Sequence, residues 1–177
     1  MSILLVGLDE DLVPPLIRRL IDQGDEVRVL ETGDRVGDRW RSLGAHVASG
    51  SLWDADLIER AAQNVRTIVV GDRHDREPTE LMDALVEGGV LASPDMRVVV
   101  VGDVAPQALA SLRASKLEYV ILGSMRRRGL LGRRARVPPE RLAEAVDAAD
   151  DLAGGPRLEL NLGDASAWRE LKLGEDP

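Results

Sequence analysis

The chain contains 177 residues, of which 31 are acidic and 23 are basic, and it has no cysteine. This length is sufficient for one domain with a substantial hydrophobic core. The lack of cysteine excludes disulfides, thiolate metal sites and a cysteine nucleophile. The net charge of −8 argues against general affinity for nucleic acid or for membrane surfaces. The N-terminal apolar run is too short for a signal peptide or a membrane span, so a cytoplasmic location is expected.

Short aliphatic runs alternate with amphipathic segments, a pattern typical of βαβ units on a parallel sheet. The first unit is the clearest, because residues 3–6 are continuously apolar and the apolar residues of 12–21 recur with helical spacing. Gly24 ends this helix, while Pro14 and Pro15 are compatible with its first turn. Further strands are predicted at residues 27–30, 45–48, 65–70, 98–101, 118–122 and 157–162. The intervening helices are predicted at residues 36–43, from Asp54 onward, and at 77–91, 106–115 and 139–152.

These elements predict a doubly wound, mostly parallel α/β sheet of about seven strands, Rossmann-like, with helices on both faces. Residues 1–163 are expected to form this single domain. Residues 164–177 are expected to be a loosely held C-terminal tail. In sheets of this kind, ligands bind at the carboxyl ends of the strands.

Four segments of the chain carry a resemblance to a known family. They are residues 3–7 with 24–30, residues 43–54, residues 115–122 and residues 137–146. Together they resemble the atypical short-chain dehydrogenase/reductase group, in its NmrA-like, NAD(P)H-binding branch, with Ser51 where that family has aspartate. The resemblance implies a Rossmann domain that binds NAD(P) at the turn after the first strand, and it implies a homodimer.

The turn after the first strand departs from that family. The family begins its first helix with Gly-x-x-Gly-x-x-Gly, whereas here Gly7 is followed by Glu10 and Val13 at the next two glycine positions. These side chains would occupy the space of a pyrophosphate, and the carboxylates of Asp9, Glu10 and Asp11 would repel it. The alternative is an ordinary acidic helix start, since acidic side chains are favourable in a first turn.

Other polar residues follow predicted strands at the same rim. Glu31 lies 24 residues beyond Gly7, which is the spacing of the acidic residue that binds an adenosine ribose. Gly71 and Asp72 follow the fourth strand, with His74 shortly after. The alternative for each is a solvated polar loop. The candidate cofactor-binding residues are therefore Gly7, Asp9, Glu10, Asp11, Glu31, Gly71 and Asp72.

No catalytic residue is predicted. The Tyr-x-x-x-Lys pair of the wider superfamily is missing, because the only tyrosine is Tyr119 and Gly123 stands four residues later. Tyr119 is expected to pack in or beside its strand. The two histidines give no ligand spacing, so no metal site is predicted. The cofactor is unassigned: the resemblance implies NAD(P), and the altered glycine positions argue against it.

A basic run occupies residues 125–136. The candidates for contact with an anion or a partner are Arg126, Arg127, Arg128, Arg133 and Arg134. The run is compatible with a solvated loop, with a nucleic-acid contact, or with an internal partner for the acidic rim. We favour the internal partner over the nucleic-acid contact.

Three functions remain open. The leading hypothesis is a non-catalytic NmrA-like protein that acts through interaction or regulation, with a protein partner or a second copy of the chain. The second is an NAD(P)-dependent oxidoreductase or epimerase-type enzyme of the atypical short-chain group. The third is a nucleic-acid or phosphoprotein-binding module that uses the arginines. A potassium-transport nucleotide-binding domain, also Rossmann-like, stays compatible with the second to fifth strands.

Overall fold

A computed structural model describes residues 2–32, 34–71, 78–93, 95–123, 126–128 and 134–173. Within them, seven strands form one sheet: β1 (Ser2–Val6), β2 (Glu26–Glu31), β3 (His46–Ser49), β4 (Thr67–Gly71), β5 (Arg97–Val101), β6 (Glu118–Gly123) and β9 (Arg157–Asn161). Their order is β3-β2-β1-β4-β5-β6-β9, and all neighbouring pairs are parallel. This order is that of a doubly wound Rossmann sheet, so the predicted fold class is confirmed.

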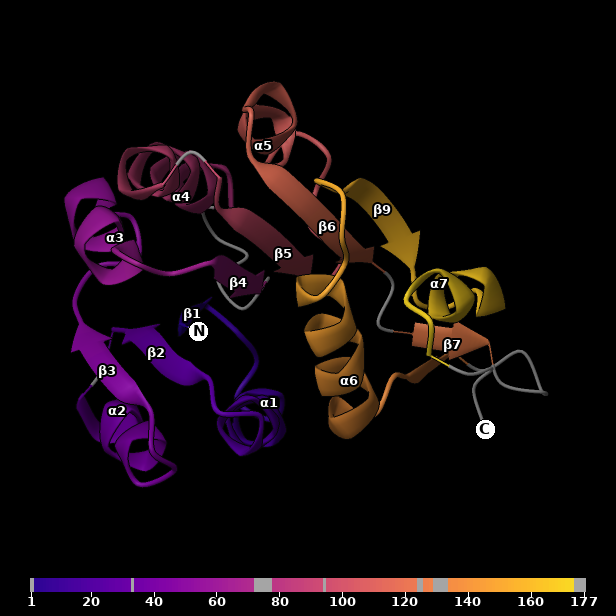
Figure 1. Cartoon of the computed structure of the whole chain (residues 1–177), viewed down its shortest axis with the longest axis horizontal. Coiled ribbons are helices and arrows are strands. Elements are labelled where there is room, and N and C mark those ends of the chain that lie inside the picture. Colours follow the sequence, from indigo (N-terminus) through magenta and orange to yellow (C-terminus); the bar gives the residue numbers. More distant parts are fainter. Residues whose placement is uncertain are drawn as a thin grey trace.

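Helices cover both faces of the sheet (Figure 1). They are α1 (Val13–Asp22), α2 (Asp34–Arg41), α3 (Ala55–Ala62), α4 (Pro78–Ala92), α5 (Ala110–Ala114), α6 (Pro139–Asp150) and α7 (Ala165–Glu170). Side chains of α1, α2, α6 and α7 pack in the hydrophobic cluster on one face, and those of α3, α4 and α5 pack in the cluster on the other.

The aliphatic strand residues explain this layering. In β1, Ile3 and Leu5 belong to one cluster and Leu4 and Val6 to the other, and all four are buried. Because successive strand residues point to opposite faces, a strand buried on both faces must be apolar throughout. The continuous apolar runs of the sequence meet this requirement.

The basic run contains a small hairpin that the sequence did not predict. Strands β7 (Arg126–Arg128) and β8 (Arg134–Arg136) pair antiparallel, with Arg127 opposite Ala135. The run was expected to lie in the loop after the sixth strand. Backbone hydrogen bonds can pair two strands whatever the side chains are, so low β-propensity does not exclude a short hairpin.

The predicted loose tail is wrong for the residues up to Leu173. Helix α7 starts directly after residue 164, and Ala167, Trp168 and Leu171 are buried in the cluster that includes α1 and α6. The indole nitrogen of Trp168 donates a hydrogen bond to the carbonyl oxygen of Leu162 at 3.1 Å. Burial of a tryptophan provides enough apolar area to hold a short helix in place.

Candidate functional site

The strand order reverses between β1 and β4, and this is where doubly wound sheets bind ligands. Gly7 follows β1 with φ 59°, and Gly71 ends β4. A Cβ atom on Gly71 would lie 2.5 Å from the carbonyl oxygen of Gly7 and 2.8 Å from the Cα of Leu8. The structure therefore brings these two predicted site glycines into contact, and only glycine fits at position 71.

The acidic turn after β1 is closed on itself by hydrogen bonds. The backbone N–H of Asp11 donates to Oδ1 of Asp9 at 3.3 Å. The N–H groups of Leu12 and Val13 both donate to the carbonyl oxygen of Asp9, at 2.9 and 3.3 Å. Three successive backbone donors at the start of α1 thus already have acceptors within the turn.

The next residues of α1 add no donor. Pro14 and Pro15 have no backbone N–H, and the N–H of Leu16 donates to the carbonyl oxygen of Leu12 at 3.2 Å. A pyrophosphate binds at a helix start through free backbone N–H groups together with the helix dipole. From residue 11 to residue 16, this helix start has no backbone N–H left to offer.

A basic residue from the neighbouring helix lies near the acidic turn. Arg39 of α2 places Nη1 3.8 Å from Oε2 of Glu10, and its guanidinium carbon lies 4.9 Å from the ring centroid of Trp40. Both members of this ion pair are substantially exposed, so its contribution to stability is small.

Glu31 lies at the end of β2 and is only 6% exposed. One of its carboxylate oxygens accepts a hydrogen bond from the backbone N–H of Thr32 at 2.9 Å. The backbone carbonyl of Glu31 accepts from the N–H of Gly50, so the loop after β3 is tied to this strand end. The structure thus places Glu31 at the rim that holds Gly7 and Gly71.

Other predicted site residues are described less fully. Asp72 lies outside the described residues, as does Arg133. Arg126, Arg127 and Arg128 form β7, and Arg134 begins β8, but their side chains are not described. In Figure 1, β7 lies on the same side of α6 as α7, away from α1. The hypothesis that these arginines neutralise the acidic turn stays a prediction.

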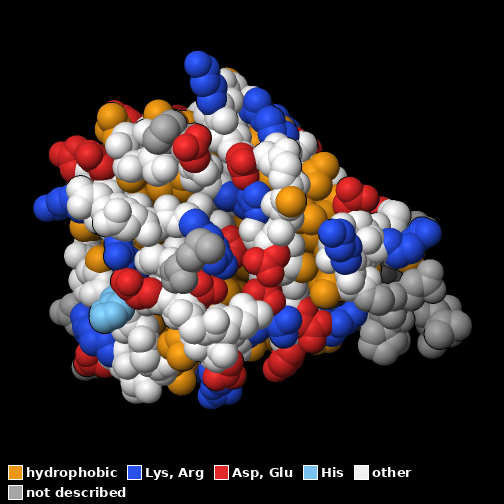
Figure 2. Space-filling view, in the orientation of Figure 1, with side chains coloured by type: hydrophobic (Ala, Val, Ile, Leu, Met, Phe, Trp, Pro, Cys, Tyr) orange, Lys and Arg blue, Asp and Glu red, His pale blue; other side chains and the backbone are white. Residues whose placement is uncertain are grey.

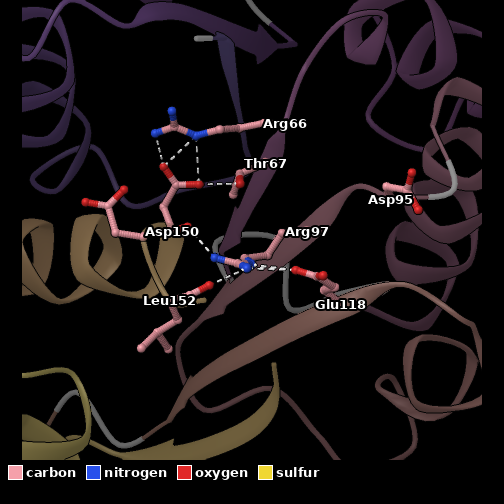
Figure 3. Close-up of a pocket in the computed structure, with 8 residues that line it drawn as sticks. Arg66, Thr67, Asp95, Arg97, Glu118, Asp150 and Leu152 are labelled. Carbon is pink, nitrogen blue, oxygen red and sulfur yellow. Dashed lines mark hydrogen bonds and ion pairs between the residues drawn. The ribbon is translucent and has the colours of Figure 1, made fainter. Parts of the chain in front are cut away.

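A second polar cluster, which the sequence did not reveal, lies at the opposite rim, where the strands begin (Figure 3). Arg66, just before β4, pairs with Asp150 at the end of α6 and with Asp25 after α1. The hydroxyl of Thr67 also donates to Asp150. The hydrogen bond that Arg66 donates to Asp150 is the main cause of the raised pKa of the Arg66 guanidinium.

Arg97, at the start of β5, completes this cluster. Its guanidinium donates to the carbonyl oxygens of Ala149, Asp150 and Leu152, and to the carboxylate of Glu118 at the start of β6. An arginine at the C-terminal end of a helix satisfies the last carbonyl groups and the helix dipole. Because both guanidiniums are bonded to acceptors of the chain itself, this cluster holds the fold together and does not form an anion site.

A shallow cavity of about 290 Å³ lies at the far end of the sheet from β3. It is lined by Asp103, Ile121, Gly123, Glu159, Leu160 and Asn161. Asp103 comes two residues after β5, so it has the same signal, a polar residue after a buried strand, that marked Asp72. Asp103 was not among the predicted site residues.

Tyr119 packs in its strand, as expected. It is 8% exposed in β6, and the guanidinium carbon of Arg157 lies 5.1 Å from its ring centroid.

Among the described residues, no group of three or more acidic or histidine side chains could hold a metal ion. No helix in the described part of the chain is long and apolar enough to cross a membrane.

Comparison with known proteins identifies the fold. No family model matches the sequence, and no curated protein is similar to it. Among solved structures, an anaerobilin reductase from Escherichia coli O157:H7 superposes with a TM-score of 0.70 at 13% identity, over 90% of this chain and 95% of that one. A protein named as an NAD-dependent epimerase/dehydratase from Bacillus halodurans superposes with a TM-score of 0.71 at 17% identity, over 97% and 99%.

A third similar structure contains the cofactor. It is a short-chain dehydrogenase/reductase from Veillonella parvula in complex with NADP, with a TM-score of 0.67 at 17% identity, over 94% of this chain and 95% of that one. The fold is therefore that of NAD(P)-binding Rossmann reductases and epimerases. At these identities, the likeness concerns the fold.

Proposed function

We propose that this chain is a Rossmann-fold protein with a degenerate dinucleotide site, non-catalytic, which acts by binding a partner or a ligand other than a dinucleotide. The observation that carries the proposal is the self-bonded start of α1. The N–H groups of Asp11, Leu12 and Val13 are bonded to Asp9, and Pro14 and Pro15 follow. A dinucleotide would have to displace the Asp9 bonds and would still gain no donor from the two prolines.

Electrostatics supports the same proposal. Asp9, Glu10 and Asp11 place three carboxylates at the position where a pyrophosphate would carry two negative charges. Two like charges a few ångströms apart repel each other, and Arg39 at 3.8 Å from Glu10 offsets only part of this charge. The missing Tyr-x-x-x-Lys pair argues further against proton transfer of the short-chain reductase type.

A second candidate is an NAD(P)-dependent reductase with an unusual phosphate loop. It is favoured by the position of Glu31, which is buried at the end of β2 where an acidic residue binds ribose. The likeness in fold to a short-chain dehydrogenase/reductase in complex with NADP also favours it, because the superposition covers nearly the whole of both chains. In this case the cofactor would be held by its ribose and its nicotinamide end more than by its phosphates.

Calorimetric titration of the full chain with NAD, NADH, NADP and NADPH separates the two candidates. If the site is degenerate, no dinucleotide should bind with a dissociation constant below about 100 μM, which corresponds to a binding free energy of about −5.5 kcal/mol. Tighter binding would overturn this proposal. If that binding is also weakened by Glu31→Gln and not by the exposed control Asp22→Asn, the reductase candidate is supported in its place.

A further inference from the structure

Strand β9 forms one edge of the sheet. Among the residues that the structure describes, β6 is its only strand partner, and Figure 1 shows β9 on the outer side of β6. Arg157, Glu159 and Asn161 are exposed, whereas Leu158 and Leu160 are partly buried against the cluster that includes α6. An edge strand presents backbone donors and acceptors that can pair with another chain.

The backbone of β9 divides its hydrogen-bonding groups between two sides. The N–H of Tyr119 in β6 donates to the carbonyl oxygen of Pro156 at 2.8 Å, so Pro156 faces β6. Alternate residues of a strand bond to opposite neighbours, and every second residue from Pro156 onward therefore faces β6 as well. The N–H and carbonyl groups of Arg157 and Glu159 point the other way, out of the sheet.

The two charged residues of β9 lie on the same face of the sheet, beside α5. Glu159 accepts from Nε and Nη2 of Arg113, at 2.8 and 3.0 Å, and its side chain is 48% exposed. Arg157 donates from Nη2 to the carbonyl oxygens of Arg113 and Ser115. These acceptors are neutral, and in the described part of the chain no carboxylate pairs with Arg157.

This spacing of charges makes β9 complementary to a second copy of itself. If two β9 strands pair antiparallel about a two-fold axis at Leu158, Arg157 lies opposite the partner's Glu159 in both halves of the pairing. These positions exchange backbone hydrogen bonds, because both residues point outward, and their side chains share one face. With the axis at Glu159, two carboxylates would face each other, and with the axis at Leu160, Glu159 would face Asn161. Charge therefore favours the register centred on Leu158.

We propose that β9 pairs antiparallel with β9 of a second copy of this chain, centred on Leu158, to form a symmetric dimer with one continuous sheet. A surface that is complementary to itself is what a two-fold interface requires, and the pairing covers the outward backbone groups of the edge. Three strands, β4, β5 and β6, separate β9 from β1. The dimer therefore does not depend on whether a dinucleotide binds at Gly7.

Sedimentation velocity of the full chain over a range of concentrations, with no dinucleotide present, tests the dimer. Arg157→Glu and Glu159→Arg should each raise its dissociation constant by about tenfold or more, because both opposite-charge pairs become like-charge pairs. An equimolar mixture of the two variants should form a heterodimer. In that mixture one copy supplies only carboxylates to the pairs and the other supplies only guanidiniums.

Arg18→Glu is the matched control, because it reverses the same charge at an exposed position of α1, and it should leave the dissociation constant unchanged. Hydrogen exchange of the unaltered chain checks the register: the amide protons of Arg157 and Glu159 should become protected as the concentration rises. This measurement decides the question even if a variant fails to fold.

Two results would overturn the proposal. The first is an unaltered chain that remains a monomer at millimolar concentration or leaves these two amide protons unprotected. The second is a mixture of folded variants that forms no heterodimer, or folded variants that dimerise as the unaltered chain does, because either result places the interface on another surface.

Discussion

Gly71 and Gly7 are in backbone contact across the switch point of the sheet, where a Cβ on Gly71 would lie 2.5 Å from the Gly7 carbonyl oxygen. Gly71→Ala should therefore force the turn after β1 away from β4 and lower the free energy of unfolding by about 1–3 kcal/mol. Urea unfolding followed by circular dichroism measures this. Gly123→Ala is the matched control, and it should change stability by less than about 1 kcal/mol, because among the described residues its Cβ meets only ordinary contacts. Equal effects of the two changes would contradict the close approach.

The Arg66–Asp150 pair should be important for stability, because the Asp150 side chain is 2% exposed. Asp150→Ala leaves Arg66 and the Thr67 hydroxyl without this acceptor. Breaking a fully buried pair costs about 3–5 kcal/mol. Since the Arg66 side chain is 27% exposed and retains Asp25, we expect about 2 kcal/mol. Asp151→Ala, an exposed neighbour on the same helix end, should have little effect in the same unfolding experiment.

The C-terminal helix should be required for a stable domain. Trp168→Ala removes an indole that is 1% exposed, so the free energy of unfolding should fall by about 3–5 kcal/mol. Truncation after residue 163 should be at least as damaging. Lys172→Ala, an exposed residue in the same segment, serves as the control. A truncated chain as stable as the full chain would restore the view that these residues are a loose tail.

Glu26 offers a test of local electrostatics. Its carboxylate accepts from Nε of Arg28 at 2.9 Å, and this hydrogen bond lowers the pKa of Glu26 below the usual glutamate value of 4.5. A lowered pKa in the folded state stabilises the fold above the unfolded pKa, and this contribution is lost as the pH falls through the folded pKa. Carbon-13 NMR titration should show the lowered midpoint, and Arg28→Gln should return it toward 4.5. An identical midpoint in both proteins would mean that the pairing is not formed in solution.

The sheet could be predicted because its strands are buried on both faces. Residues 98–101, for example, are apolar without interruption. Such a short apolar run between two helices is typical of a strand that is buried on both faces of a parallel sheet. The boundaries of the helices could be predicted less accurately than the strands. The helix predicted over 106–115 begins only at Ala110, because the preceding residues form tight turns, with the N–H of Ala108 donating to Ala105.

The site could be predicted only in part. That Gly7 and Glu31 lie at the same rim of the sheet could be predicted from their distance along the chain, since a βαβ unit has a narrow range of lengths. The role of Asp150 could not be predicted, because the sequence does not indicate whether a polar helix residue contacts solvent or an arginine that is distant along the chain. The use of the Asp9 acceptors by Leu12 and Val13 also depends on turn geometry that spacing does not encode.

The face of the molecule shown in Figure 2 carries acidic and basic side chains that are interspersed. Among the described residues, Arg19, Arg66, Arg97 and Arg113 form ion pairs with acidic side chains. A surface of mixed charge gives no extended basic area for a nucleic-acid backbone.

Arg97 joins three elements. It lies at the start of β5, and its guanidinium donates hydrogen bonds to the end of α6 and to Glu118 at the start of β6. With Arg66 beside it, the strand-starting rim of the sheet is cross-linked by charge-assisted hydrogen bonds. Thermal motion is consequently restrained at that rim. Any rearrangement on binding should be taken up at the opposite rim, so amide protons near Gly102 and Gly123 should exchange with solvent sooner than those near Arg66 and Arg97.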